Sequence, residues 1–247
     1  MISVIIITLN EEKNIKRAMD SIKNIADEII VVDSESTDKT TQIAQKLGAK
    51  VFIRKFDNFA NQKNWAQSKA SNNWILALDA DEEIPEKLAD EIKQGISSDE
   101  IAGYLIPRRN FILGKEIKYS RWSPDKHIWL WKKDKGRWIG DVHEEVKVLG
   151  KVGQFKNSKI HHSHKTISEF LDSNNFYSAL LAESMYKKGV RFSFLKMVWD
   201  SIWEFKIRFF YKLGFLDGWR GLCLAYLMAI YHLMVWIKLW QKNNQKS

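Results

Sequence analysis

Two aspartates, Asp79 and Asp81, follow an apolar run at residues 74–78 and are separated by one residue. Carboxylates at this spacing can hold a hard divalent cation such as Mg²⁺ or Mn²⁺, which often shares its ligands with substrate phosphates. The triplet is common in surface loops, so it is a weak signal by itself. The apolar run before it predicts a buried strand, which would place both carboxylates at the end of that strand.

The first hundred residues predict alternating strands and helices. Apolar runs rich in β-branched residues predict buried strands at residues 3–8, 28–33, 50–54 and 74–78. Helical spacing of apolar residues predicts helices at residues 14–24, 38–47 and 62–69, and Pro85 can open a fourth helix that ends near Gly95. Ser36 or Thr37 is a candidate cap for the second of these helices. The alternation predicts βαβ units and a mostly parallel sheet, in which ligands bind beyond the carboxyl ends of the strands.

Polar side chains follow three of these strands. Thr8, Asn10 and Glu11 come at the end of the first strand, Asp33 ends the second, and the two aspartates follow the fourth. Because the carboxyl ends of parallel strands meet at one edge, we expect these groups to converge there. Ordinary turn and helix-capping roles remain the alternative for each of them.

The second half of the sequence has a different pattern. Strands without intervening helices are predicted at residues 104–109, 127–132 and 146–149, and helices at residues 168–188 and 192–213. A break at residues 214–221 precedes an apolar segment at residues 222–237, which is shorter than the ~20 residues that cross a bilayer. We therefore expect an α/β domain at residues 1–165 and a helical region at residues 166–247.

Composition restricts the partners. The 247 residues carry a net charge of +9 and a single cysteine, which excludes an internal disulfide framework and fits a reducing compartment. The N-terminal sequence has no pattern of a signal peptide. Residues 190–247 hold nine Lys/Arg against three Asp/Glu, and 14 of the 31 aromatic residues. Basic residues interleaved with aromatic ones predict a helical extension on an anionic membrane surface, and no nucleic-acid-binding motif accompanies them.

Several segments, in this order, resemble a known family: SVIIITLNEEKNI, DEIIVVDSESTDKT, GAKVF, NQKNWA, WILALDADE, PRRNFILGK, SPDKHIWLWKK, VHEEV and GFLDGW. They are similar to the inverting glycosyltransferases of family 2, and within it to the bacterial lipopolysaccharide-core β-glucosyltransferase group. The resemblance implies a GT-A fold, which is Rossmann-like with a mostly parallel central sheet. It also implies a nucleotide-sugar half at residues 1–100 and an acceptor half at residues 101–165. Glu35 departs from the family, which usually has glycine there.

The resemblance assigns roles to the donor side. The nucleoside and sugar phosphates would contact Thr8, Asn10, Glu11, Asp33, Lys63 and Asp79. A divalent metal, Mg²⁺ or Mn²⁺, would be held by Asp81 with help from Asp79 and His161. The alternatives are an exposed helix lysine for Lys63 and a core or surface histidine for His161. Glu82 is expected to be a solvated charge.

Inversion needs a base that removes the acceptor's proton opposite the departing diphosphate. The segment VHEEV implies Glu144 as that base, with Asp141 as second candidate and His143 as a positioning group; a charged turn is the alternative. Arg109, Trp122 and Asp125 are candidates for the acceptor side, where basic and aromatic groups would suit a phosphorylated sugar.

Together these features predict the metal-dependent transfer of a hexose from a UDP-hexose, with glucose as the expected sugar. The acceptor would be a sugar of a lipid-linked glycan such as the lipopolysaccharide core. The enzyme would be cytoplasmic and peripheral on the inner face of the cytoplasmic membrane. A polyprenyl-phosphate glycosyltransferase is the main alternative, followed by a nucleotidyltransferase and by a non-catalytic membrane-bound scaffold.

Overall fold

The computed structural model describes residues 1–140 and 144–244, which belong to two compact units. The first unit comprises Met1–Arg109 and Asp125–His161, and the second comprises Asn110–Pro124 and His162–Ser247. The helical region expected at residues 166–247 therefore lies within the second unit. Residues 110–124, which we expected in the acceptor half, belong to the second unit as well.

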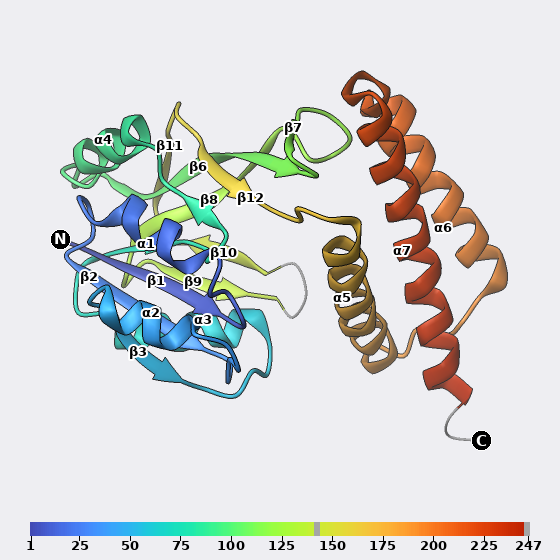
Figure 1. Ribbon diagram of the computed structural model, residues 1–247, viewed down its shortest axis with the longest axis horizontal. Helices are drawn as coiled ribbons and strands as arrows, with labels where there is room; N and C mark the ends of the chain where they lie inside the picture. Colours follow the sequence, from blue (N-terminus) through green and yellow to red (C-terminus); the bar gives the residue numbers. More distant parts are fainter. Residues whose placement is uncertain (141–143, 245–247) are drawn as a thin grey trace. The chain divides into compact units, whose positions relative to one another are not determined.

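The first unit begins with the predicted alternation of strands and helices (Figure 1). The elements are β1 (Ile2–Thr8), α1 (Ile15–Ile22), β2 (Glu28–Asp33), α2 (Thr40–Lys46), β3 (Lys50–Ile53), α3 (Phe59–Lys69) and β4 (Trp74–Ala77). β1 pairs in parallel with both β2 and β4, and β2 pairs in parallel with β3. Most apolar side chains of β1, β2 and β4, such as Ile5, Ile30 and Ile75, are buried, as expected for strands covered on both faces, whereas those of β3 are partly exposed.

The register of these strands brings their polar ends to one edge of the sheet. Thr8 is opposite Asp33 in the pairing of β1 with β2. On the other side of β1, the amide of Leu78 donates to the carbonyl of Ile5 at 3.1 Å, so the chain leaves β4 beside β1. The predicted convergence of the three polar segments is therefore present.

Most of the remaining strands join this sheet and make it mixed, and two of them pair only with each other in a separate antiparallel sheet. The elements are β5 (Glu82–Glu83), α4 (Glu86–Gly95), β6 (Ile101–Ile112), β8 (Asp125–Lys132), β9 (Gly136–Ile139), β10 (Glu145–Val148), β11 (Lys151–Gln154) and β12 (Lys159–His162). The sheet order is β3-β2-β1-β4-β8-β6-β12-β5, and β8 is antiparallel to both of its neighbours. Strands joined without crossover helices can pair in this antiparallel way. The parallel arrangement is thus confined mainly to β3-β2-β1-β4.

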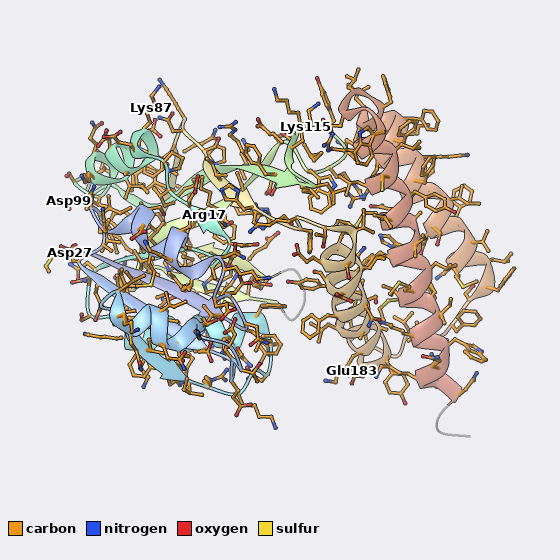
Figure 2. All side chains as sticks on the ribbon, in the orientation of Figure 1. Arg17, Asp27, Lys87, Asp99, Lys115 and Glu183 are labelled. Atoms are coloured by element: carbon orange, nitrogen blue, oxygen red, sulfur yellow. The ribbon has the colours of Figure 1, made fainter. Side chains whose placement is uncertain are left out.

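The second unit contains β7 (Lys115–Ile117), α5 (Ile167–Lys187), α6 (Phe194–Lys206), a π-helical turn η1 (Ile207–Tyr211), a 3₁₀ turn η2 (Gly214–Asp217) and α7 (Trp219–Asn244). The Thr166 hydroxyl caps α5 by accepting from the Glu169 amide at 3.2 Å. Glu183 on α5, labelled in Figure 2, pairs with Lys242 on α7. Ala182, Trp236 and Leu239 are buried together in one of the unit's apolar clusters.

The last helix is longer than its apolar segment suggested. α7 has 26 residues, whereas we expected an apolar segment at residues 222–237. Among the described residues, α7 alone has the length and apolar composition to cross a membrane, and 39% of its most apolar window is buried inside the protein. Its length therefore does not distinguish a spanning helix from one that packs on its neighbours.

Candidate active site

The ends of β1 and β2 are joined by hydrogen bonds. The Asp33 carboxylate is fully buried and accepts from the Thr8 hydroxyl at 2.8 Å and from the Ser36 hydroxyl and amide at 2.6 and 2.8 Å. The Asn10 side-chain oxygen accepts from the Thr37 amide at 2.8 Å. Ser36 and Thr37 therefore hold the two loops together, and the prediction that one of them caps α2 is wrong, since α2 begins at Thr40. Nucleotide contacts of Thr8, Asn10 and Asp33 stay predictions.

Glu35 occupies a backbone conformation that favours glycine. Its φ is 66°, and Asn10 in the facing loop has a φ of 56°. Side chains other than glycine adopt this left-handed region at a cost of about 1–2 kcal/mol. Glu35 therefore adopts a turn conformation that glycine would adopt more easily, at the cost of local strain.

Glu11 lies in an acidic environment beside these loops. Burial raises the pKa of Glu11 to about 7; the hydrogen bond from Asn14 lowers it, and the charges of Asp81 and Asp79 raise it further. The Asn14 amide donates to the Glu11 carboxylate at 2.8 Å. Several carboxyl groups thus share one region, which favours the binding of a cation.

Asp81 and His161 are adjacent because β5 pairs with β12. In this antiparallel pairing His161 is opposite Glu82, the residue after Asp81. The His161 Nε2 atom lies 3.1 Å from a carboxylate oxygen of Asp81. Burial alone would lower the pKa of His161, but the neighbouring Asp81 raises it above its usual value. Two residues that are 80 positions apart in the sequence, and that we predicted to share a metal, are therefore in contact.

These two side chains fit a hard divalent cation that also takes ligands from its substrate. In the described part of the chain, no group of three or more His, Cys, Asp or Glu side chains is arranged to hold a metal. The protein would supply one carboxylate and one imidazole, and Mg²⁺ commonly takes only one or two protein carboxylates and completes its shell with water and phosphate oxygens. Asp79 pairs with Lys63 at 3.5 Å, and its help in holding a metal stays a prediction.

Lys63 lies between two carboxylates. Its ammonium is 2.8 Å from Glu144 Oε1 and 3.5 Å from Asp79 Oδ1, and only 6% of the side chain is exposed. Burial alone would lower the pKa of Lys63, but the charges of Asp79 and Glu144 raise it. The ammonium also lies 4.4 Å from the centre of the Trp138 ring. Lys63 is therefore not the exposed helix lysine of the alternative interpretation.

The neighbours of Lys63 on α3 fix its position. The Asn64 side chain donates to the Trp138 carbonyl at 2.9 Å and accepts from the Trp138 amide at 3.1 Å, which ties α3 to β9. Gln62 is fully buried and donates to the Ser34 hydroxyl at 3.1 Å. The three consecutive side chains thus link the nucleotide-side loop, the two carboxylates and β9.

Glu82 and Lys159 form a buried ion pair, which corrects the expectation that Glu82 is solvated. Their charged atoms are 2.5 Å apart and both side chains are fully buried. The same Glu82 oxygen accepts from the Asp79 amide at 3.0 Å, and Arg108 lies 3.3 Å from the other oxygen. Burial lowers the pKa of Lys159 to about 8, although Glu82 and Asp79 oppose that effect. Glu82 lies on β5, the last strand in the sheet order, and the pairing of β5 with β12 brings Glu82 close to Lys159.

The predicted acceptor residues are distributed over both units. Asp125 pairs with Arg108 at 2.7 Å and with His127 at 3.0 Å, and Arg109 is exposed on β6. Trp122 belongs to the second unit, where it packs against an apolar cluster that includes Phe170 and Leu224. Acceptor binding by these residues stays a prediction. Asp141 and His143 lie outside the described residues.

Sequence reasoning missed Lys159, although a signal was present. Lys159 and His161 are two positions apart in a short strand, so their side chains lie on the same face of the sheet. A lysine sharing a face with a candidate metal ligand indicates a nearby carboxylate. The two-residue strand β5, by contrast, is too short to leave a periodic pattern.

Comparison with known proteins identifies the family. A family model described as glycosyl transferase family 2 matches residues 3–142. An uncharacterized glycosyltransferase of Rickettsia typhi is 34% identical over 251 residues, which cover 96% of this chain and 86% of the relative. The chain therefore belongs to glycosyltransferase family 2, whose members transfer sugars.

The relationship extends to enzymes of the lipopolysaccharide core. The lipopolysaccharide core biosynthesis glycosyltransferase LpsC of Rhizobium meliloti is 28% identical over 256 residues, covering 100% of this chain and 94% of LpsC. Among solved structures, glucosyl-3-phosphoglycerate synthase from Mycobacterium tuberculosis in complex with phosphoglyceric acid has a TM-score of 0.50 at 17% identity, over 78% of this chain and 81% of that one. This similarity supports the GT-A fold alone.

Proposed function

We propose that the protein is a metal-dependent inverting glycosyltransferase that moves a hexose, most simply glucose from UDP-glucose, onto a sugar of a lipid-linked glycan such as the lipopolysaccharide core. The observation that carries this proposal is the contact of Asp81 with His161 beside the Lys63–Asp79–Glu144 group. The relationship to LpsC supports the choice of acceptor.

On the donor side, Asp81 and His161 would hold Mg²⁺ or Mn²⁺. When bound, the cation would neutralise charge on the departing diphosphate. Asp79 is suited to the ribose hydroxyls or to a metal-bound water, because the positive charges of Lys63 and Lys159 oppose the effect of burial and lower the pKa of Asp79 to about 2. A carboxylate that is ionised at neutral pH accepts hydrogen bonds from hydroxyl groups.

On the acceptor side, Glu144 would act as the base. The acceptor oxygen would attack the anomeric carbon while the bond from that carbon to the diphosphate oxygen breaks, with its electron pair leaving on the diphosphate. The hydroxyl proton would pass to Glu144. Lys63 already donates to one oxygen of this carboxylate, which orients the group. The Glu144 side chain is 13% exposed, which leaves it partly accessible to an acceptor.

Replacing Glu144 with Gln tests this role. Transfer should fall by about 100-fold or more, the usual contribution of a general base, while UDP binding stays near that of the wild type. Glu145→Gln is the matched control, because Glu145 is the next residue and is exposed. Glycosidic product made by Glu144→Gln at the wild-type rate would exclude it as the base. A lipid phosphosugar as product would instead favour the polyprenyl-phosphate reaction.

We also propose that the helices of the second unit hold the enzyme on the inner face of the cytoplasmic membrane. Exposed aromatic side chains on α6, including Trp199 and Trp203, support this placement together with the basic residues of the segment. The full-length protein should float with vesicles that contain anionic lipid and separate from them at high salt. Equal recovery with purely zwitterionic vesicles at every salt concentration would contradict the electrostatic part.

A further inference from the structure

A groove in the second unit lies between α6, η1 and α7. Its lining includes Ile202, Phe205, Lys206, Phe210, Tyr226 and Ala229, and its accessible walls are apolar. The groove has a volume of about 340 Å³ and is open to solvent along much of its length. Sites of about 300–1,000 Å³ are typical for small molecules, so this groove has the size for one flexible chain.

The apolar surface continues beyond the groove. Trp199 and Trp203 stack at 5.9 Å on α6, and 64% of Trp199 is exposed. Phe210 and Tyr226, which line the groove, are also exposed to more than half of their surface, at 54% and 62%. Soluble proteins rarely leave a contiguous apolar surface of this kind uncovered.

In the segment at residues 196–217, the basic and acidic side chains differ in their exposure and hydrogen bonding. The lysines of this segment are exposed: Lys196, Lys206 and Lys212. Its acidic side chains instead accept hydrogen bonds within the unit: Asp200 from the Trp236 indole at 2.9 Å, Glu204 from Arg208 at 2.6 Å, and Asp217 from the Tyr119 amide at 3.0 Å. Lys206 is the charged residue in the lining of the groove, and it is exposed, so the groove carries a positive charge that complements an anionic partner.

We propose, building on the membrane association inferred above, that this groove holds one hydrocarbon chain of an anionic lipid while Lys206 contacts its headgroup. The apolar walls match the chain, the positive rim matches the headgroup, and the surrounding rings suit the headgroup level of a bilayer. A lipid seated in this way would anchor the second unit at a defined point.

Binding of a dansyl-labelled fatty acid to the full-length protein, without vesicles, tests the groove directly. The wild type should bind one probe per chain, and oleate should displace it. Ala229→Trp should fill the groove and weaken binding by about tenfold or more. Ala179→Trp is the matched control, because it adds the same ring at an exposed position on α5 and should leave binding unchanged. Equal affinity of wild type and Ala229→Trp would overturn the proposal.

Further variants and a second probe distinguish loss of lipid binding from misfolding and from occupation of the groove by another partner. Ile202→Glu places a charge at a half-exposed position of the lining and should also abolish binding, with thermal unfolding checked for each variant. Lys206→Glu should weaken the binding of the fatty acid more than the binding of the alcohol with the same chain length. A wild-type dimer that Ala229→Trp dissociates would overturn the proposal, because a second copy would then cover the groove.

Vesicle flotation and UDP binding are measured on the same proteins. A wild type that floats with vesicles but does not bind the probe would defeat only the groove, whereas failure of the wild type to float would defeat the membrane association. Failure of UDP to bind defeats the proposed transfer and leaves the groove unaffected.

Discussion

Glu28 at the start of β2 provides a test of the fold that is separate from catalysis. Its carboxylate accepts from the Ser3 hydroxyl at 2.5 Å, from the Lys50 ammonium at 2.6 Å and from the Ser71 amide at 2.9 Å. It therefore joins β1, β2, β3 and the turn before β4. Burial alone would raise the pKa of Glu28, but these hydrogen bonds lower it to about 2.

The lowered pKa fixes the sign and size of the pH dependence. The unfolded chain binds a proton at this group near pH 4.5, whereas the folded protein does so only near pH 2. The ionised carboxylate thus contributes about 3 kcal/mol to the free energy of unfolding above pH 4.5, and this contribution is lost as the pH falls from 4.5 to 2. Glu28→Gln should remove most of it at pH 7.

Urea unfolding of the wild type and Glu28→Gln between pH 7 and pH 2.5 measures this contribution. The difference between the two proteins should be largest at pH 7 and shrink steadily below pH 4.5. Glu100→Gln is the control, because Glu100 pairs with Lys151 at 3.1 Å with 79% of its side chain exposed, and it should change stability by less than about 1 kcal/mol. A difference for Glu28→Gln that is the same at pH 7 and pH 3 would refute this reasoning.

Lys159→Met should lower the free energy of unfolding by about 3 kcal/mol, because it leaves the buried Glu82 carboxylate without its main partner; an unchanged urea midpoint at pH 7 would contradict the buried pair. Glu35→Gly should raise stability by about 1 kcal/mol by relieving the positive φ of 66°, and a lower melting temperature would show that the Glu35 side chain matters more than the strain. Gly221→Ala should cost about 1–3 kcal/mol, since its Cβ would lie 1.8 Å from the Gly214 carbonyl oxygen; wild-type stability would show that η2 and α7 do not pack so closely.

The parallel half of the fold was predictable from local sequence. β1 and β2 are continuous apolar runs, and α1 buries Ile15, Ala18, Met19 and Ile22 at helical spacing, so each element carries its own pattern. The edge at which Thr8 and Asp33 meet follows from parallel pairing alone. The antiparallel strands were harder to predict, because β5 has two residues and its pairing with β12 is set by tertiary structure.

For the candidate site, the sequence indicated some of the residues that lie together, but not their individual contacts. Asp81 and His161 were expected to share a metal, and they do lie together. The burial of Glu82 and Lys159 was not visible, since charged residues are usually exposed and one partner's environment depends on the other. Likewise, nothing local indicated that Lys63 would lie between Asp79 and Glu144.

Calorimetric titration of UDP, with Mn²⁺ and after chelation, tests most directly whether a cation at Asp81 and His161 secures the donor's diphosphate. Mn²⁺ should tighten UDP binding by roughly tenfold or more for the wild type and for Asp99→Ala, whose exposed side chain is labelled in Figure 2. The metal should have no effect on UDP binding by Asp81→Ala. Equal affinities for all three proteins in the presence and absence of Mn²⁺ would contradict the central claim.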